Sequence, residues 1–197
     1  MRKKVLYKRL NMHGFTIVEM LVAIFVFTIV MVISTGAILS VLDANRKTQS
    51  VQLVVDNVDF AVESMTRTLR TGSSYHCDIS AGTIINPRNC KNGADSIVFE
   101  EAKKDPNNPN DNYVYRLNTT TKQIERSTNS GSSFVPITAS NVEITGLTFY
   151  VVDAEDPTDQ TQPRIIISVR GKAGGADVRS SSVFNLQTTV SQRLRDI

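Results

Sequence analysis

An uncharged apolar run near the N-terminus limits what this chain can fold into more than any other feature. No charged residue occurs from Met20 to Leu42. A helix needs about 20 consecutive apolar residues to cross a bilayer, so this run predicts a membrane-spanning helix. Residues 1–13 contain no acid and five basic residues, which are Arg2, Lys3, Lys4, Lys8 and Arg9. Because basic flanks stay cytoplasmic, we expect the C-terminal part of the chain to lie outside.

Glu19 stands at the start of this run and needs an explanation. A carboxylate in hydrocarbon costs roughly 2.5–3.5 kcal/mol on insertion scales, so it is normally paired or functional. A cut after Gly14 would create an ammonium group on Phe15, one helical turn from Glu19. That ammonium group could pair with Glu19 of its own chain or of a neighbouring subunit. Proteolysis would therefore supply the missing partner.

Two other classes of N-terminal segment share part of this pattern. A secretory signal peptide has a shorter apolar region, closed by a small-residue cleavage site. Here the run is too long, and Ser34-Thr35-Gly36-Ala37 is the nearest approach to such a site. A plain single-pass anchor is also basic on one side and apolar. It gives no reason for Glu19.

The segment Gly14-Phe15-Thr16-Ile17-Val18-Glu19 resembles the N-terminus of type IV prepilins and prepseudopilins. The resemblance implies that Gly14 precedes the cut made by prepilin peptidase, and that Phe15 becomes the N-methylated N-terminus. It implies that Glu19 recruits the subunit into a filament. The implied partners are the peptidase/methyltransferase, other pilin or pseudopilin subunits bound through the N-terminal helix, and an assembly platform in the membrane.

The downstream residues resemble this family in layout, a long helix followed by a sheet. Segments 97–117 and 182–190 resemble W-type minor pilins and J-type minor pseudopilins. Many major pilins have a proline about twenty residues into the mature chain, where this sequence has Gly36. Glycine within a helix costs up to about 1 kcal/mol relative to alanine. We therefore expect bending or local melting at Gly36.

The overall charge of +3 is due to residues 1–14, the expected leader, which has five basic residues and no acid. Without its five basic residues the chain has 17 basic and 19 acidic residues, a charge of −2. The alkaline isoelectric point therefore gives no argument for nucleic-acid binding. With 197 residues, we expect one compact domain and an anchor.

Cys77 and Cys90 lie beyond the anchor, so the expected orientation places them in an oxidising compartment. We favour a disulfide, which would stabilise by about 3 kcal/mol for a loop of this size. Two free buried thiols remain an alternative, because spacing alone does not prove pairing. A zinc site needs four ligands, and only His76 lies nearby.

Residues 43–71 continue without proline and predict an amphipathic extension of the helix. Apolar residues recur at spacings of three and four, the period of a helix with one buried stripe. If unbroken from Phe15 to Thr71, the helix would be roughly 85 Å long. We expect the stripe to pack on a sheet; its members are Val51, Val54, Val55, Val58, Ala61, Val62, Met65 and Leu69.

After Gly72 the sequence predicts strands and turns. A hairpin is predicted over Tyr113–Leu117 and Gln123–Arg126. Any strand that contains Pro136 is expected to lie at the edge of a sheet. The alternation of apolar and polar residues shifts by one position at Gly146, which predicts a β-bulge there. Further strands are expected at 96–99, 164–170 and 184–190, the last with one buried face, and Gly171–Gly175 is expected to be a hairpin turn. These elements predict one antiparallel sheet against the helix.

Few residues offer catalytic or metal chemistry. The polar loops 103–112 and 153–159 contain oxygen ligands, but neither has the spacing of a known calcium loop. Only His13 and His76 are present, and no nucleophile motif occurs. We therefore predict no cofactor, no metal and no enzymatic activity, because no general base can be nominated.

The sequence thus predicts an α+β fold with four segments. Residues 1–14 are a cleaved leader, 15–42 the membrane and assembly half of the helix, 43–71 its amphipathic half, and 72–197 an extracytoplasmic β-rich head. The resemblance implies a filament subunit, minor rather than major, for a pilus, type II secretion or DNA uptake. The alternative is a single-pass membrane-anchored extracellular binding module.

Overall fold

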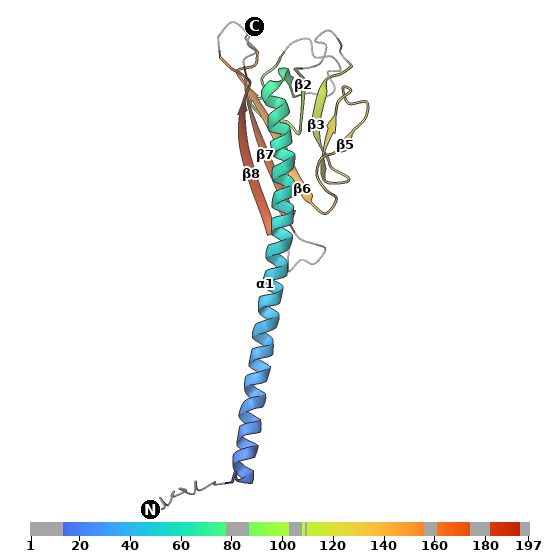
Figure 1. Cartoon of the computed structure of the whole chain (residues 1–197). Coiled ribbons are helices and arrows are strands. Elements are labelled where there is room, and N and C mark those ends of the chain that lie inside the picture. The colour runs from blue at the N-terminus through green and yellow to red at the C-terminus, as the bar shows by residue number, and fades with distance from the viewer. Residues whose placement is uncertain are drawn as a thin grey trace, which may run out of the picture. The chain divides into compact units, whose positions relative to one another are not determined.

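The computed structural model describes residues 14–77, 87–102, 108, 110–155, 161–173 and 182–193. The chain divides into two compact units, residues 1–46 and 47–197. It has the predicted α+β composition, one helix followed by antiparallel strands (Figure 1). The elements are α1 (Ile17–Thr71), β1 (Ser73–His76), β2 (Ser96–Glu100), β3 (Tyr113–Asn118), β4 (Gln123–Ser127), β5 (Val135–Pro136), β6 (Glu143–Val152), β7 (Arg164–Ala173) and β8 (Ser182–Ser191).

The first unit contains the start of α1 and no buried side chain among its described residues. Residues 14–46 are all exposed. By length and composition this part of α1 can cross a membrane. The helix continues through Gly36 without interruption, so the local melting predicted there is not present. A Cβ at Gly36 would meet no atom within 4 Å.

The apolar stripe of the second half of α1 forms one wall of the head's core. Val54, Val58, Ala61, Val62, Met65 and Leu69 are buried as predicted, and Val51 is half-buried. The prediction is wrong for Val55, whose side chain is 43% exposed. Val55 lies at the edge of the stripe, because each residue turns the helix by about 100°.

The strands form two antiparallel sheets rather than the single sheet that the sequence predicted. One sheet has the order β1-β2-β3-β4-β5, and the other has the order β6-β7-β8. The predicted hairpin is confirmed, since β3 pairs with β4 and Leu117 lies opposite Ile124. The two-residue strand β5, which contains Pro136, is an edge strand as predicted.

The three-stranded sheet contains the predicted bulge and one corrected turn. The register between β6 and β7 shifts between Ile144 and Gly146. Gly171 lies within β7, so the turn predicted at Gly171–Gly175 is wrong for its first three residues; Gly174 and Gly175 lie outside the described residues. A Cβ on Gly171 would be 2.4 Å from Cζ of Phe184. Glycine is therefore required where the Phe184 ring crosses β7.

An aromatic cluster joins the end of α1 to the five-stranded sheet. The ring of Phe99 lies 6.1 Å from Tyr75, 5.8 Å from Tyr113 and 5.9 Å from Tyr115, measured between ring centroids. The hydroxyls of Thr68 and Tyr115 are hydrogen-bonded at 2.8 Å. Burial raises the pKa of the Tyr75 and Tyr115 phenols. These contacts hold the helix on the sheet through both packing and hydrogen bonds.

The carbonyl groups at the C-terminal end of α1 are satisfied by two other segments. The Tyr75 hydroxyl lies 2.6 Å from the Leu69 carbonyl oxygen and 2.7 Å from that of Gly72. The side-chain amide of Gln192 donates to the Gly72 carbonyl at 3.0 Å, and the backbone N–H of Arg193 donates to the Arg70 carbonyl at 2.7 Å. Since the last four carbonyls of a helix lack helical partners, these bonds fix where α1 ends.

A disulfide joins Cys77 to Cys90, whose Cα atoms are 6.2 Å apart. The residues beside Cys90 connect both sheets. The N–H of Arg88 donates to the Tyr75 carbonyl of β1, and the N–H of Cys90 donates to the Val151 carbonyl of β6. The disulfide therefore ties the end of β1 to a segment that is held on the other sheet.

Replacing both Cys77 and Cys90 with serine is expected to lower the free energy of unfolding by about 3 kcal/mol, because the cross-link restricts the unfolded chain. Urea titration of the full chain in detergent, followed by tyrosine fluorescence, measures this loss. Dithiothreitol should lower the urea midpoint of the natural sequence and leave that of the double variant unchanged. An unchanged midpoint in the double variant would contradict a stabilising disulfide.

Candidate processing and assembly site

The start of α1 brings the candidate processing and assembly residues into one short segment. Gly14 and Phe15 precede the helix, and α1 begins at Ile17. The backbone N–H of Glu19 donates to the Thr16 hydroxyl at 3.2 Å, and that of Met20 donates to the Thr16 carbonyl at 3.2 Å. Thr16 is therefore the N-cap residue, and Glu19 is the third residue of the helix.

This arrangement gives Glu19 a local role that the sequence analysis missed. A threonine followed three residues later by glutamate is the sequence pattern of a capping box. A carboxylate in the first helical turn is also stabilised by the positive end of the helix dipole, typically by 0.3–1 kcal/mol. The signal was readable in Thr16-Ile17-Val18-Glu19. Glu19 thus favours helix formation even before any partner charge is considered.

Side chains around Glu19 are apolar and unusually exposed. Phe15 is 79% exposed, Ile17 82% and Val18 69%. The same holds along the helix as far as Leu42. A helix that is apolar on all sides is stable in a bilayer or among similar helices rather than in water. The segment therefore requires an apolar environment outside its own chain.

Gly14 lies in open space. A Cβ added to Gly14 would meet no atom within 4 Å, and the structure shows no left-handed backbone at this residue. Nothing in the described part of the chain therefore requires glycine at this position. The rest of the predicted leader, residues 1–13, lies outside the described residues.

Residues 9–35 match the family model described as the prokaryotic N-terminal methylation motif. The match supports a type IV prepilin-like protein. It includes Gly14, Phe15 and Glu19 and ends before the amphipathic half of α1. No curated protein and no solved structure matches the chain.

The prepilin-like motif, the apolar helix and the head together fit a membrane-anchored protein with a head domain. The same motif suggests a structural subunit rather than an enzyme, one that is processed by prepilin peptidase and assembled with other pilin subunits. The motif covers the N-terminal segment alone and does not distinguish a pilus from a secretion or DNA-uptake machine.

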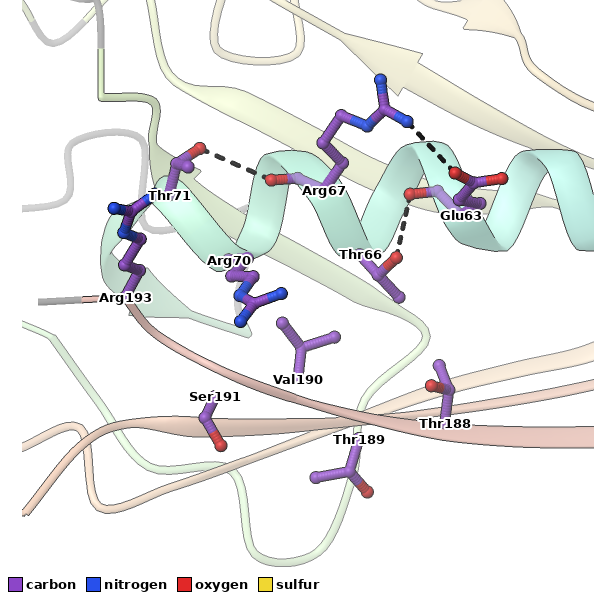
Figure 2. A pocket seen from close by; sticks show the side chains of 10 residues that line it. All are labelled: Glu63, Thr66, Arg67, Arg70, Thr71, Thr188, Thr189, Val190, Ser191 and Arg193. Atoms are coloured by element: carbon purple, nitrogen blue, oxygen red, sulfur yellow. Dashed lines mark hydrogen bonds and ion pairs between the residues drawn. The ribbon is translucent and has the colours of Figure 1, made fainter.

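The head has a groove of about 840 Å³ beside the last turns of α1 (Figure 2). Arginine and hydroxyl side chains dominate its lining, and its single carboxylate, that of Glu63, pairs with Arg67 at 3.1 Å. The lining residues are Glu63, Thr66, Arg67, Arg70 and Thr71 of α1, Thr188–Ser191 of β8, and Arg193. This groove offers cations to a partner.

Metal-binding groups are not brought together in the part of the chain that the structure describes. No three His, Cys, Asp or Glu side chains there lie close enough to hold an ion. Most of the two loops considered for calcium, including residues 103–107 and 156–159, lies outside the described residues. Glu155 in the second loop accepts a hydrogen bond from the backbone N–H of Asn89 at 2.9 Å.

Proposed function

We propose that this chain is a subunit, minor rather than major, of a type IV filament that serves a pilus, type II secretion or DNA uptake. The observation that carries the proposal is the methylation motif at residues 9–35, which extends into a helix that is exposed and apolar on every side as far as Leu42. The motif contains the residues at which processing would occur. The exposed helix has a surface that only lipid or other subunits can cover.

In this proposal prepilin peptidase cuts after Gly14, and the same enzyme methylates the new amine of Phe15. Residues 15–42 hold the subunit in the membrane until assembly, and the amphipathic residues 43–71 carry the head. The head, residues 72–197, lies outside the cytoplasm, where an oxidising compartment supports the Cys77–Cys90 disulfide.

Assembly then exchanges one apolar environment for another. A motor complex lifts the subunit out of the bilayer, and residues 15–42 leave lipid for the same stretch of neighbouring subunits. Van der Waals packing of the exposed side chains replaces the contacts with lipid. The Phe15 amine pairs with Glu19 of its own or a neighbouring chain, which removes the cost of an unpaired charge among apolar side chains.

The cut after Gly14 is tested by a Gly14→Ala variant. We expect the share of processed protein to fall several-fold, because the peptidase must accommodate a methyl group beside the bond that it cuts. The chain itself has room for this methyl group, so the variant should insert and fold normally. Intact mass of the membrane-extracted protein measures the ratio of long to short forms.

A Lys8→Ala variant is the matched control, since it changes a leader residue away from the bond and should be processed normally. Equal processing of the Gly14→Ala variant and the natural sequence would contradict Gly14 as the residue before the cut.

A single-pass anchored binding module is the second candidate. The position of Glu19 favours it in one respect, because a carboxylate in the first turn of a helix is stabilised by the helix dipole without any filament partner. The two candidates differ in intact mass, since only a filament subunit loses residues 1–14.

A further inference from the structure

Strand β8 is the outer strand of the three-stranded sheet and has one free edge. In the order β6-β7-β8 it pairs with β7 along its whole length, from Ser182 to Ser191. Within the part of the chain that the structure describes, no other segment bonds to the backbone of β8. A free edge presents a row of unpaired N–H and C=O groups, which is a template for a further strand.

The register identifies the residues of β8 that face this free edge. The N–H of Gln192 donates to the Pro163 carbonyl at 2.9 Å, which extends the register between β7 and β8 by one residue as a hydrogen-bonded pair. Hydrogen-bonded pairs occur at every second residue of antiparallel strands. The residues between them direct their N–H and C=O groups away from β7, and these are Val183, Asn185, Gln187, Thr189 and Ser191.

The opposite edge of the same sheet is covered by the chain itself. The same alternation makes Phe149 and Val151 of β6 face away from β7. Phe149 exchanges two backbone hydrogen bonds with Ala94, and the Val151 carbonyl accepts one from the N–H of Cys90. The outer groups of β6 are therefore bonded, in contrast to those of β8.

The five-stranded sheet has short edge strands, which is a common protection against unwanted pairing. β5 has two residues, one of which is Pro136, and β1 has four residues with an irregular register against β2. β8 has ten residues, without proline or a charged side chain, and a regular register with β7. The long, unprotected edge of β8 therefore indicates a site for strand pairing.

The groove beside the last turns of α1 lies at the C-terminal end of β8 and contains two available cations. Thr188–Ser191 of β8 line it, together with Arg70 and Arg193. Figure 2 shows Arg70 directed toward β8. Neither arginine forms an ion pair among the described residues, whereas Glu63 is already paired with Arg67. A carboxylate at this end of an added strand would therefore meet two cations.

The face of β8 that is turned toward α1 offers apolar contacts to the same strand. Figure 2 shows Thr188 and Val190 on this face, directed toward α1. Phe184 and Leu186 share the face, and both pack against the core while remaining half-buried. Side chains on neighbouring strands lie about 4.5–5.5 Å apart, so an added strand would cover both. Its side chains on this face should therefore be apolar, at alternate positions.

We propose that the free edge of β8 binds an extended segment of a partner protein as a further antiparallel strand, with carboxylates at the start of that segment against Arg70 and Arg193. Backbone hydrogen bonds would provide affinity, and the alternate apolar side chains and the acidic end would provide specificity. The antiparallel direction matches the other strands of the sheet. A second copy of β8 fits less well, because Ser182–Ser191 contains no acid. The site lies wholly in the head, so it stands or falls separately from the proposed filament function.

Hydrogen exchange of the purified full-length chain in detergent, followed by NMR, tests whether the edge is open. We expect the amides of Asn185, Gln187 and Thr189 to exchange several-fold faster than those of Leu186 and Thr188, because only the latter bond to β7. Equal protection of the two sets would show that the edge is covered and would overturn the proposal.

Photo-cross-linking in the native cell envelope identifies the occupant of the edge. Asn185, whose side chain is exposed, is replaced with benzoylphenylalanine, and mass spectrometry reads the peptide that becomes attached. We expect a segment of another protein with apolar residues at alternate positions, preceded by acidic residues. The same replacement at Val135, an exposed residue of the edge strand β5, is the control and should not give this product. A cross-link to a second copy of the chain, a peptide without this pattern, or no cross-link at Asn185 would overturn the proposal.

A proline at the free edge tests the role of the backbone hydrogen bonds. Gln187→Pro removes an N–H that does not bond to β7, and proline is tolerated where the N–H faces outward from an edge strand. The cross-link from position 185 should fall several-fold while the urea midpoint of the chain stays the same. Gln187→Ala is the matched control and should cross-link normally. An undiminished cross-link in Gln187→Pro would contradict strand pairing.

Charge reversal tests the acidic end and does not depend on how well the proline is tolerated. The double variant Arg70→Glu, Arg193→Glu should reduce the same cross-link several-fold, because the carboxylates of the partner would then face like charges. Lys91→Glu reverses an exposed cation outside the groove and should leave the yield unchanged. Equal yields from the double variant and Lys91→Glu would contradict an acidic partner.

Discussion

Replacing Phe99 with alanine is expected to lower the free energy of unfolding by about 3–5 kcal/mol, the range for deleting a buried phenylalanine ring. Phe99 is completely buried and contacts three tyrosine rings. A Cβ built on Gly72 would lie 2.5 Å from the Phe99 ring, so the ring also fills the space at the end of α1. Its loss would open a cavity where the helix meets the five-stranded sheet.

The urea midpoint of the full chain in detergent measures this effect. The chain has no tryptophan, so tyrosine fluorescence reports on Tyr75 and Tyr115 beside the substituted ring. Phe60→Ala is the matched control, because the same substitution at a 71% exposed ring should change the free energy by less than about 0.5 kcal/mol. Similar losses for Phe99→Ala and Phe60→Ala would contradict the assignment of Phe99 to the core.

A Glu19→Ala variant is expected to insert into the membrane normally and to enter filaments more than tenfold less than the natural sequence. In the proposed assembly the Phe15 amine would be left as an unpaired charge among apolar side chains. Removing one member of a buried ion pair commonly costs 3–5 kcal/mol, and each 1.4 kcal/mol corresponds to a factor of ten. Membrane insertion should not suffer, because the substitution makes the helix more apolar.

The measurement compares the chain in sheared extracellular filaments with the chain in the membrane fraction. Glu19→Gln separates charge from capping, since the amide retains hydrogen bonding but has no charge to form an ion pair with the Phe15 ammonium group; it should fail like Glu19→Ala. Met20→Ala is the control within the same helical turn and should assemble normally. Normal incorporation of Glu19→Gln would contradict the ion pair and leave helix capping as the role of Glu19.

The helix and several strands were predictable because their signals are local. The absence of proline and the apolar spacing predicted one continuous helix to Thr71, and Pro136 predicted an edge strand. The phase slip at Gly146 predicted the shift in register. Each of these features follows from the backbone preference or periodicity of a few consecutive residues.

The division into two sheets was not predictable in the same way. Alternation shows which face of a strand is buried, but it does not show which strands are neighbours. The short strand β1, Ser73–His76, has no apolar alternation and is placed by its pairing with β2. Gly171 continues β7 because it pairs with Ile144 of β6 and Phe184 of β8. These features depend on residues that are distant in sequence.

The candidate processing and assembly residues could be identified from the sequence, because their signal is also local. Gly14, Phe15 and Glu19 could be selected from six consecutive residues, and the matched motif includes all three. The helical spacing also left Phe60 out of the predicted buried stripe, and its ring is 71% exposed.

The N-terminal residue of the protein isolated from its native cell envelope tests the central claim most directly. The account predicts that sequencing and mass spectrometry find an N-methylated phenylalanine, Phe15, followed by Thr16 and Ile17. A chain that begins at Met1 and retains residues 1–14 would contradict it.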